Sequence, residues 1–238
     1  MAEPKHIRGN IFNSKCQTLV NTVNCDGVMG RGIALEYKLR FPGLFDKYKL
    51  KCEQKELTPG KLYLWRGEEK IILNFPTKNH WKFPSKMSYI ESGLENFARN
   101  YKEKNISSIA FPILGSSAGG LNEDDVIDVM TKYFETLENI DIEIYHYDPN
   151  ADDNLFDKLY QKVHRFDVDD YINHIGIKKS QATKIKQAIY SGEIKNMLMI
   201  QNISGFGEKS IKKLYDFLND NRKTIETSSE KQLGLTFE

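Results

Sequence analysis

Two glycine-rich stretches of the sequence have the composition of anion-binding loops. The first, "CDGVMGRGIA" (25–34), follows the apolar run 18–24, and the second, "GSSAGGLNED" (115–124), follows the run 107–114. Glycine lets backbone N–H groups approach a ligand closely, and the helix that each stretch leads into attracts negative charge at its N-terminus. Neither stretch has the order of a Walker loop or of the dinucleotide-binding motif. One such loop is more often a simple turn, whereas two on neighbouring strands indicate a diphosphate site.

The segment "FPTKNHW" (75–81) carries two side chains suited to catalysis. The amine of Lys78 can attack a carbonyl-like carbon as a nucleophile, or stabilise charge while a glycosidic bond breaks. His80 can move a proton near neutral pH, although a structural or base-stacking role fits it equally well. Trp81 is either a core residue or a platform for a nucleobase. Most lysines are solvated surface charges, so the position of Lys78 after an apolar run is what singles it out.

Strands that alternate with helices must position these residues. Apolar or β-branched runs predict strands, and the stretches between them predict helices. The predicted strands are 18–24, 61–65, 70–75, 107–114 and 141–147, and the predicted helices are 30–40, 43–55, 87–104 and 123–138. This alternation predicts an α/β domain over residues 1–150, with a largely parallel sheet of mixed direction. Ligands of such sheets bind at the carboxyl ends of the strands, where both glycine loops are expected.

Composition narrows the class of protein. The 238 residues are 39% hydrophobic, which is enough for a core, and the net charge is +1. The three cysteines fit neither a disulfide framework nor a zinc site, so no metal and no cofactor is expected. The N-terminus lacks the apolar core of a signal peptide, and no run approaches membrane-spanning length. We therefore expect a cytoplasmic protein, a monomer, with no membrane contact.

Residues 155–221 predict a second, small all-helical domain. Two glycine turns, 174–179 and 202–210, interrupt its helices. The sequence "ISGFG" (203–207) resembles the turn of a helix-hairpin-helix element, which presents backbone N–H groups to a DNA phosphate. The earlier turn resembles a degenerate copy in which Lys178 replaces the second glycine.

The charge of this region supports an interaction with DNA. Residues 174–213 contain eight lysines and two glutamates, a net charge of +6, whereas residues 1–150 are balanced. A basic helical stretch is usually a solvated face, but together with glycine hairpins it favours sequence-independent DNA binding. The predicted DNA-binding residues are Lys178, Lys179, Gly205, Gly207, Lys209 and Lys212.

Three ordered motifs of the first domain resemble the macrodomain family. They are "LVNTVNCDGVMGRGIALEYKLRFP", "LNFPTKNHW" and "FPILGSSAGGLN", and the resemblance covers about residues 7–148. Within that family they are most similar to the branch of DarG-type DNA ADP-ribosyl glycohydrolases. The resemblance implies a three-layer α/β/α sandwich with a mixed sheet that binds ADP-ribose.

The resemblance also implies roles for individual residues. Asn24 would bind the distal ribose, unless it is simply a turn residue at a strand end, and Lys78 would lie beside the anomeric carbon of that ribose. Asn10 stands where many macrodomains place an aspartate against adenine. Gly119 stands where protein-directed relatives carry an acidic residue, which favours a DNA substrate. The implied ligand-binding residues are Asn10, Ile11, Asn24, Gly27, Val28, Met29, Gly30, Arg31, Gly32, Ile33, Thr77, Leu114, Gly115, Ser116, Ser117, Ala118, Gly119, Gly120 and Leu121.

These features predict an enzyme that removes ADP-ribose from thymidine or guanosine bases of DNA, as an antitoxin or a repair enzyme. The alternatives are a non-catalytic ADP-ribose reader and a hydrolase of ADP-ribosyl protein or O-acetyl-ADP-ribose. The expected partners are ADP-ribose, ADP-ribosylated DNA and a DarT-type toxin.

The tail, residues 222–238, contains a further short motif, "QLGLTF" (232–237). Its residues Gln232, Leu233, Leu235 and Phe237 resemble the peptide by which bacterial repair proteins dock on the sliding clamp. The alternative is that the tail packs back on the fold.

Overall fold

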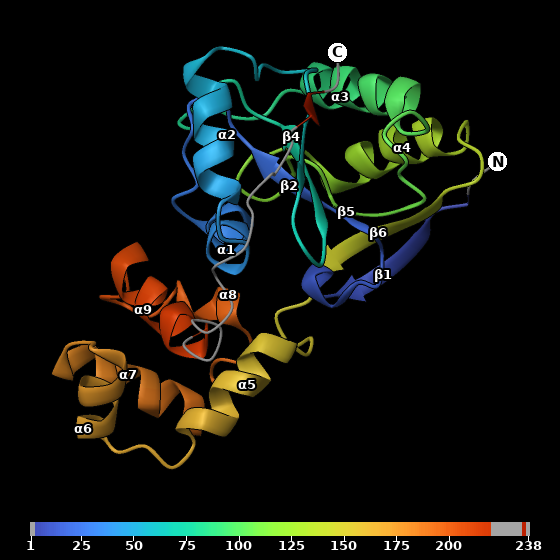
Figure 1. The fold of residues 1–238 in the computed structure, drawn as a ribbon. Helices are drawn as coiled ribbons and strands as arrows, with labels where there is room; N and C mark the ends of the chain where they lie inside the picture. The colour runs from blue at the N-terminus through green and yellow to red at the C-terminus, as the bar shows by residue number, and fades with distance from the viewer. Residues whose placement is uncertain (1–2, 220–234, 237–238) are drawn as a thin grey trace. The chain divides into compact units, whose positions relative to one another are not determined.

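The chain forms two compact units, which are described separately (Figure 1). The computed structural model describes residues 3–219 and the backbone of residues 235–236. The sheet unit contains residues 3–29, 41–147 and 235–236, and the helical unit contains residues 30–40 and 148–219. The helical unit therefore includes the helix within residues 30–40. A division of the sequence at residue 150 assigns this helix to the α/β domain.

The sheet unit is built on one mixed sheet with the strand order β1-β6-β5-β2-β4-β3-β7. The strands β1, β6, β5, β2 and β4 run parallel, whereas β3 pairs antiparallel with β4 and with the short β7. The prediction of an α/β fold with a sheet of mixed direction is confirmed. The bounds are β1 (Lys5–Gly9), β2 (Thr18–Val23), β3 (Tyr63–Arg66), β4 (Ile71–Pro76), β5 (Ser108–Pro112), β6 (Asp141–Tyr147) and β7 (Leu235–Thr236).

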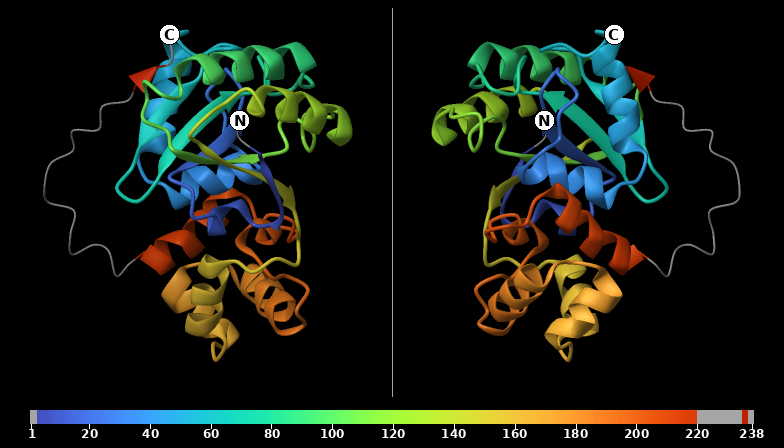
Figure 2. Two further views of the ribbon diagram at one scale, coloured as in Figure 1. Left: turned by 90° about the vertical axis from the view of Figure 1, so that its right-hand side faces the viewer. Right: turned by 90° about the vertical axis from the view of Figure 1, so that its left-hand side faces the viewer.

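Helices cover both faces of this sheet. The helices α3 (Met87–Asn100) and α4 (Glu123–Phe134) lie side by side over one face (Figure 2), and α2 (Leu44–Glu53) lies on the other (Figure 1). The helices α3 and α4 end before residues 104 and 138, where the sequence predicted their ends. After each of them the chain turns at an asparagine with positive φ, Asn105 (54°) and Asn139 (57°). Asparagine tolerates this left-handed conformation better than most residues, so it can close a helix.

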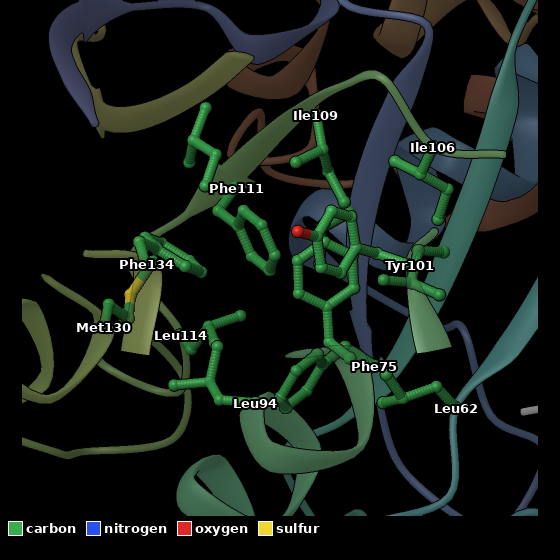
Figure 3. Close-up of a cluster of buried hydrophobic side chains, with 14 of the residues drawn as sticks. Leu62, Phe75, Leu94, Tyr101, Ile106, Ile109, Phe111, Leu114, Met130 and Phe134 are labelled. Carbon is green, nitrogen blue, oxygen red and sulfur yellow. The ribbon is translucent and has the colours of Figure 1, made fainter. Parts of the chain in front are cut away.

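Aromatic side chains fill the core under α3 and α4 (Figure 3). The ring of Phe111 lies 5.4 Å from that of Phe97 and 4.8 Å from that of Phe134. Gly93 of α3 lies against Phe75 of β4 so closely that a Cβ there would be 2.2 Å from the ring. A glycine at this position lets α3 approach the end of β4, and Lys78 follows that end by two residues.

The helical unit consists of two helical hairpins packed with α1 and α5. In each hairpin, a turn with a left-handed glycine, Gly176 (φ 76°) or Gly205 (φ 91°), precedes a long helix. The next residue, Ile177 or Phe206, is buried. The elements are α1 (Gly32–Arg40), α5 (Asn154–Val163), α6 (Val168–Asp170), the short π-helix η2 (Tyr171–Ile175), α7 (Lys179–Tyr190), α8 (Met197–Ile200) and α9 (Glu208–Asn219).

A buried charge cluster joins α1 to the rest of the helical unit. The guanidinium of Arg40 donates to both carboxylate oxygens of Asp153 at 2.8 and 2.7 Å, and its Nε donates to Glu36 at 2.7 Å. Asp153 also accepts the backbone N–H groups of Leu155 and Met197, so it holds the starts of α5 and α8. Two carboxylates thus share one cation in a place where water cannot reach them.

Candidate functional site

Asn24 organises the first glycine loop immediately after β2. Its side-chain oxygen accepts the N–H groups of Asp26 (3.0 Å) and Val28 (3.2 Å), and its amide donates to the Val28 carbonyl (2.6 Å). The buried hydroxyl of Tyr48 donates to the Asn24 carbonyl at 2.7 Å. The structure therefore shows the turn role of Asn24 that the sequence left open, and its contact with a ribose stays a prediction.

Two glycines of this loop have backbone conformations that other residues rarely adopt. Gly27 has a φ of 78° and Gly32 a φ of 62°. A Cβ on Gly27 would also lie 3.3 Å from the side chain of Lys49. The loop residues Val28, Gly30 and Arg31 are exposed, so its outer surface is accessible to a ligand.

The part of this loop that belongs to the helical unit is held by Gln201. The Gly32 N–H donates to Oε1 of Gln201 at 2.8 Å, and Nε2 of Gln201 donates back to the Gly32 carbonyl at 3.2 Å. Gln201 directly follows α8, and it lies 169 residues from Gly32 along the chain. The first N–H groups of an α-helix have no acceptor within the helix, so this pairing fixes the start of α1. Gln201 could not be predicted from the sequence, since nothing local to it indicates the contact.

The second glycine loop, Leu114–Leu121, closes tightly on itself. The Leu121 N–H donates to the Gly115 carbonyl at 3.1 Å. A Cβ on Gly119 would lie 2.1 Å from that same carbonyl oxygen and 2.3 Å from the hydroxyl of Ser85. An acidic side chain therefore has no room at position 119 in this loop conformation. Ser117 and Ala118 are exposed at its tip.

Lys78 lies at the carboxyl end of β4 and reaches the second loop. The backbone N–H groups of Thr77 and Lys78 donate to the Val23 carbonyl at 3.0 and 3.4 Å, which extends the pairing of β4 with β2. The Lys78 amine donates to the Ala118 carbonyl at 2.5 Å, across 40 residues of chain. The structure thus brings together the predicted catalytic amine and the predicted ligand loop. Its position relative to a substrate stays a prediction.

His80 lies over the first loop beside an acid that the sequence analysis did not single out. Nδ1 of His80 is 3.6 Å from Oδ2 of Asp26, and the same oxygen accepts the N–H of Trp81 at 2.8 Å. The ring of His80 is oriented by the N–H of Lys82, which donates to Nδ1 at 3.2 Å, and it lies beside Asp26. The place of Asp26 one residue before Gly27 does not by itself indicate the contacts with His80 and Trp81.

Asn10 and Ile11 form the start of a short turn next to β1. The side chain of Asn10 accepts the N–H of Phe12 at 3.1 Å and so caps the 3-10 turn η1 (Ile11–Asn13). Ile11 is 5% exposed. Their predicted contact with adenine is untested, and the observed role of Asn10 is that of a cap.

The cysteine thiols near the first loop are poor candidates for a nucleophile. Burial raises the pKa of Cys25 to about 12 and that of Cys52 to about 11. The Sγ of Cys25 instead donates to the Lys78 carbonyl at 3.4 Å. A thiol acts as a nucleophile in its thiolate form, which both environments disfavour.

The hairpin turns of the helical unit are linked to one another by two lysines. Lys184 of α7 donates to the Ser204 carbonyl at 2.9 Å, and Lys213 of α9 donates to the Gly176 carbonyl. Each long helix therefore stabilises the turn of the other hairpin, and these two charges are already engaged. Lys212 pairs with Asp216 at 2.7 Å.

Five of the predicted DNA-binding positions are exposed, but the backbone N–H of one of them is already hydrogen-bonded. Lys178, Lys179 and Lys209 are exposed, as are Gly205 and Gly207. The backbone N–H of Lys178 donates to the side chain of Gln181 at 3.0 Å, so that amide is occupied in the first hairpin. Their binding of DNA is not tested by the structure.

The described part of the chain has neither a cluster of metal-ligating side chains nor a membrane-spanning helix. Among residues 3–219 and 235–236, no three histidine, cysteine or acidic side chains lie close enough to hold a metal ion. None of the helices in the same residues is long and apolar enough to cross a membrane.

Comparison with known proteins identifies the family. The Macro domain family profile matches residues 20–130. The DNA ADP-ribosyl glycohydrolase of Mycobacterium tuberculosis is 43% identical over 141 residues, which cover 58% of this chain and 40% of that protein. That of Thermus aquaticus is 38% identical over 145 residues, which cover 59% of this chain and 40% of that protein. The chain thus spans about two fifths of the length of these curated relatives.

Solved structures agree with this assignment. The macrodomain of Mycobacterium tuberculosis DarG is 42% identical, with a TM-score of 0.58, and the match covers 61% of this chain and 97% of that one. The structure of Thermosipho africanus DarTG in complex with ADP-ribose is 39% identical, with a TM-score of 0.57, and the match covers 60% of this chain and 41% of that one. The chain belongs to the macrodomain family.

Proposed function

We propose that this macrodomain protein hydrolyses the bond between ADP-ribose and a nucleobase of DNA. The observation that carries the proposal is the position of Lys78, whose amine reaches the second glycine loop at the Ala118 carbonyl. The relatives at 38–43% identity are named DNA ADP-ribosyl glycohydrolase, which supports the same reaction here. The crowded Gly119 supports a DNA substrate, because the acid of protein-directed relatives has no room there.

Lys78 acts in this proposal on the anomeric carbon of the distal ribose. The lysine ammonium gives up a proton, and the amine then attacks that carbon, which forms a C–N bond and breaks the bond to the base nitrogen; the base nitrogen takes up the proton. Water then displaces the amine: its hydroxyl stays on the carbon of the released ADP-ribose, and its proton returns to the lysine. His80, which lies beside Asp26 two residues after Lys78, passes a proton between the amine and the base in this proposal.

The remaining ligand residues hold ADP-ribose in place for this step. Backbone N–H groups of 27–33 and 114–121 bind the diphosphate, Asn24 and Thr77 contact the distal ribose, and Asn10 with Ile11 contacts adenine. A loop of several glycines suits a diphosphate because its N–H groups can approach the anion without a side chain between them.

The helical unit binds the DNA strand in this proposal. Exposed Gly205 and Gly207 offer backbone N–H groups to a phosphate, and exposed Lys178, Lys179 and Lys209 surround them with positive charge. Lys212 contributes less, since Asp216 offsets its charge. Such contacts bind DNA of any sequence and weaken as salt rises.

Two protein partners complete the proposal. One relative is named as a fusion of a DNA ADP-ribosyl transferase with the glycohydrolase, so a DarT-type transferase toxin is the expected source of the modified DNA. The sliding clamp is the second, through the motif at 232–237. Of that motif, Gln232, Leu233 and Phe237 lie outside the described residues, and the backbone of Leu235 pairs with β3.

The experiment is release of ADP-ribose from a thymidine- or guanosine-ADP-ribosylated oligonucleotide, with Lys78→Ala as the variant and Lys132→Ala, at an exposed lysine of α4, as the control. Release by the wild type and by Lys132→Ala, but not by Lys78→Ala, is expected, with ADP-ribose affinity retained in all three. Tight binding of ADP-ribose without release from either base would reject the enzyme and leave a reader of ADP-ribose.

A further inference from the structure

The segment that follows Lys78 exposes a cluster of aromatic rings. Trp81 is 48% exposed and Phe83 is 63% exposed. The ring of His80 is nearly parallel to that of Trp81, with centroids 6.2 Å apart, and lies 5.0 Å from that of Phe83. We call these three rings the aromatic platform. Neighbouring apolar rings left in water mark a surface that a ligand covers.

Main-chain hydrogen bonds hold the aromatic platform at both ends. The N–H of Trp81 donates to Asp26 at 2.8 Å, and the N–H of Ser85 donates to the Gly119 carbonyl at 2.9 Å. Asp26 and Gly119 belong to the first and second glycine loops, so the platform borders the site that we propose for ADP-ribose. A surface fixed in advance loses little conformational entropy when a ligand stacks on it.

Asp26 contacts the aromatic platform, but the lysines of the platform's own segment outnumber this acid and so favour a polyanion. Residues 71–90 contain no aspartate or glutamate, and Lys78, Lys82 and Lys86 are spaced through them. The amine of Lys82 lies 5.1 Å from the centre of the Trp81 ring. Aromatic rings interleaved with lysines are typical of surfaces on which single-stranded nucleic acid stacks its bases while its phosphates meet the lysines.

We propose that the aromatic platform stacks unpaired nucleobases of the DNA strand that carries the ADP-ribose, next to the modified nucleotide. The proposal rests on the proposed function and makes the substrate single-stranded, since a base in a duplex is already stacked between its neighbours. Trp81 and Phe83 recognise the strand through the π faces of its bases, which all four bases share, so the platform accepts any sequence.

Binding of unmodified DNA tests the platform without any turnover. A short single-stranded thymidine oligonucleotide is titrated into the full chain while tryptophan fluorescence is recorded. Trp65, the other tryptophan, is 3% exposed, so quenching by a stacked base reports on Trp81. We expect quenching in the wild type, none in Trp81→Phe with affinity largely kept, and affinity about 5- to 100-fold weaker in Trp81→Ala. The same strand in a duplex should give no quenching, because its bases are already stacked on their neighbours.

Binding of modified DNA then distinguishes contacts with the DNA strand from contacts with ADP-ribose itself. Trp81→Ala and Phe83→Ala should weaken binding of an ADP-ribosylated oligonucleotide and leave the affinity for free ADP-ribose unchanged. Tyr160→Ala, which removes an exposed ring of α5, is the matched control and should affect neither ligand. Equal losses for both ligands would mean that the rings contact adenine, and no loss for either would leave them without a ligand; both results overturn the proposal. A wild type that releases no ADP-ribose would reject the proposed enzyme, while quenching by the oligonucleotide would still support the platform.

Discussion

Replacing Glu36 by glutamine should make the protein more stable at alkaline pH. Glu36 is 1% exposed, and burial, opposed by Arg40 and reinforced by Asp153, raises its pKa from 4.5 to about 7. Asp153 takes two hydrogen bonds from Arg40, so the single cation does not neutralise both acids. The other titratable neighbours are Tyr37 and Tyr215, whose raised pKa values keep both hydroxyls neutral over this range.

The direction in which stability changes with pH follows from whether the folded or the unfolded state binds the proton of Glu36 more tightly. Because the folded state has the higher pKa, the stability due to protonated Glu36 is complete below about pH 4.5 and is lost as pH rises through 7. The two pKa values differ by about 2.5, and each unit corresponds to about 1.4 kcal/mol, so the full loss is about 3 kcal/mol. About 1 kcal/mol of it has already occurred at pH 5.

The assay is urea unfolding at pH 5 and pH 8 for the wild type, Glu36→Gln and the exposed control Glu193→Gln. Glutamine keeps the shape of the side chain and an oxygen that accepts from Arg40, but it cannot ionise. From pH 5 to pH 8, the free energy of unfolding of Glu36→Gln should rise by about 2 kcal/mol relative to the wild type. Glu193→Gln should show no such change. A difference that stays constant with pH, or that favours the wild type at pH 8, would mean that Glu36 is ionised throughout and that its attraction to Arg40 outweighs its burial.

Three further predictions concern the loops and the hairpins. Gln201→Met keeps the length of the side chain but removes both hydrogen bonds to Gly32. Each contributes about 1 kcal/mol, so calorimetry should find ADP-ribose binding up to about 30-fold weaker. Gly119→Asp places atoms on a carbonyl oxygen, so it should cost about 2–3 kcal/mol in thermal unfolding and abolish detectable ADP-ribose binding; an intact affinity would show that the loop opens easily. Replacing Lys178 and Lys209 by alanine should lower the slope of log affinity for DNA against log salt by about 1 each, and an unchanged slope would remove these lysines from the DNA contact.

The sequence predicted β2, β3, β4, β5 and β6 from their apolar or β-branched residues. β2, β4 and β5 are parallel strands buried over most of their length, and such strands carry apolar side chains on both faces, which makes them visible in the sequence. β6 alternates the buried Ile142 and Ile144 with less buried acidic residues, so its apolar residues mark one face. β1 was missed because "KHIRG" is an edge strand whose charged side chains are exposed. An edge strand needs no apolar run, so periodicity does not reveal it.

The residues of the candidate site divide in a similar way. Lys78 and the glycine loops were predictable because each follows a strong strand signal directly. Asp26 and Ser85 were not, because their hydrogen bonds to Trp81 and Gly119 depend on how distant loops meet. The role of Gln201 rests on a contact across 169 residues, which no local pattern encodes.

The helix α1 shows how the compact units of the structure differ from a division of the sequence at residue 150. Its position between strands suggested that it belongs with the sheet, but Leu35 and Leu39 are buried in one cluster with Leu159, Ile185 and Leu214 of the helical unit. That cluster forms only after the last helices are made, so the pattern of α1 alone cannot indicate it. Because α1 continues the first glycine loop, its fixation by Gln201 and by the buried charge cluster also fixes Gly32. Binding of a ligand to this loop is therefore linked to the stability of the helical unit, and a variant that weakens one should weaken the other.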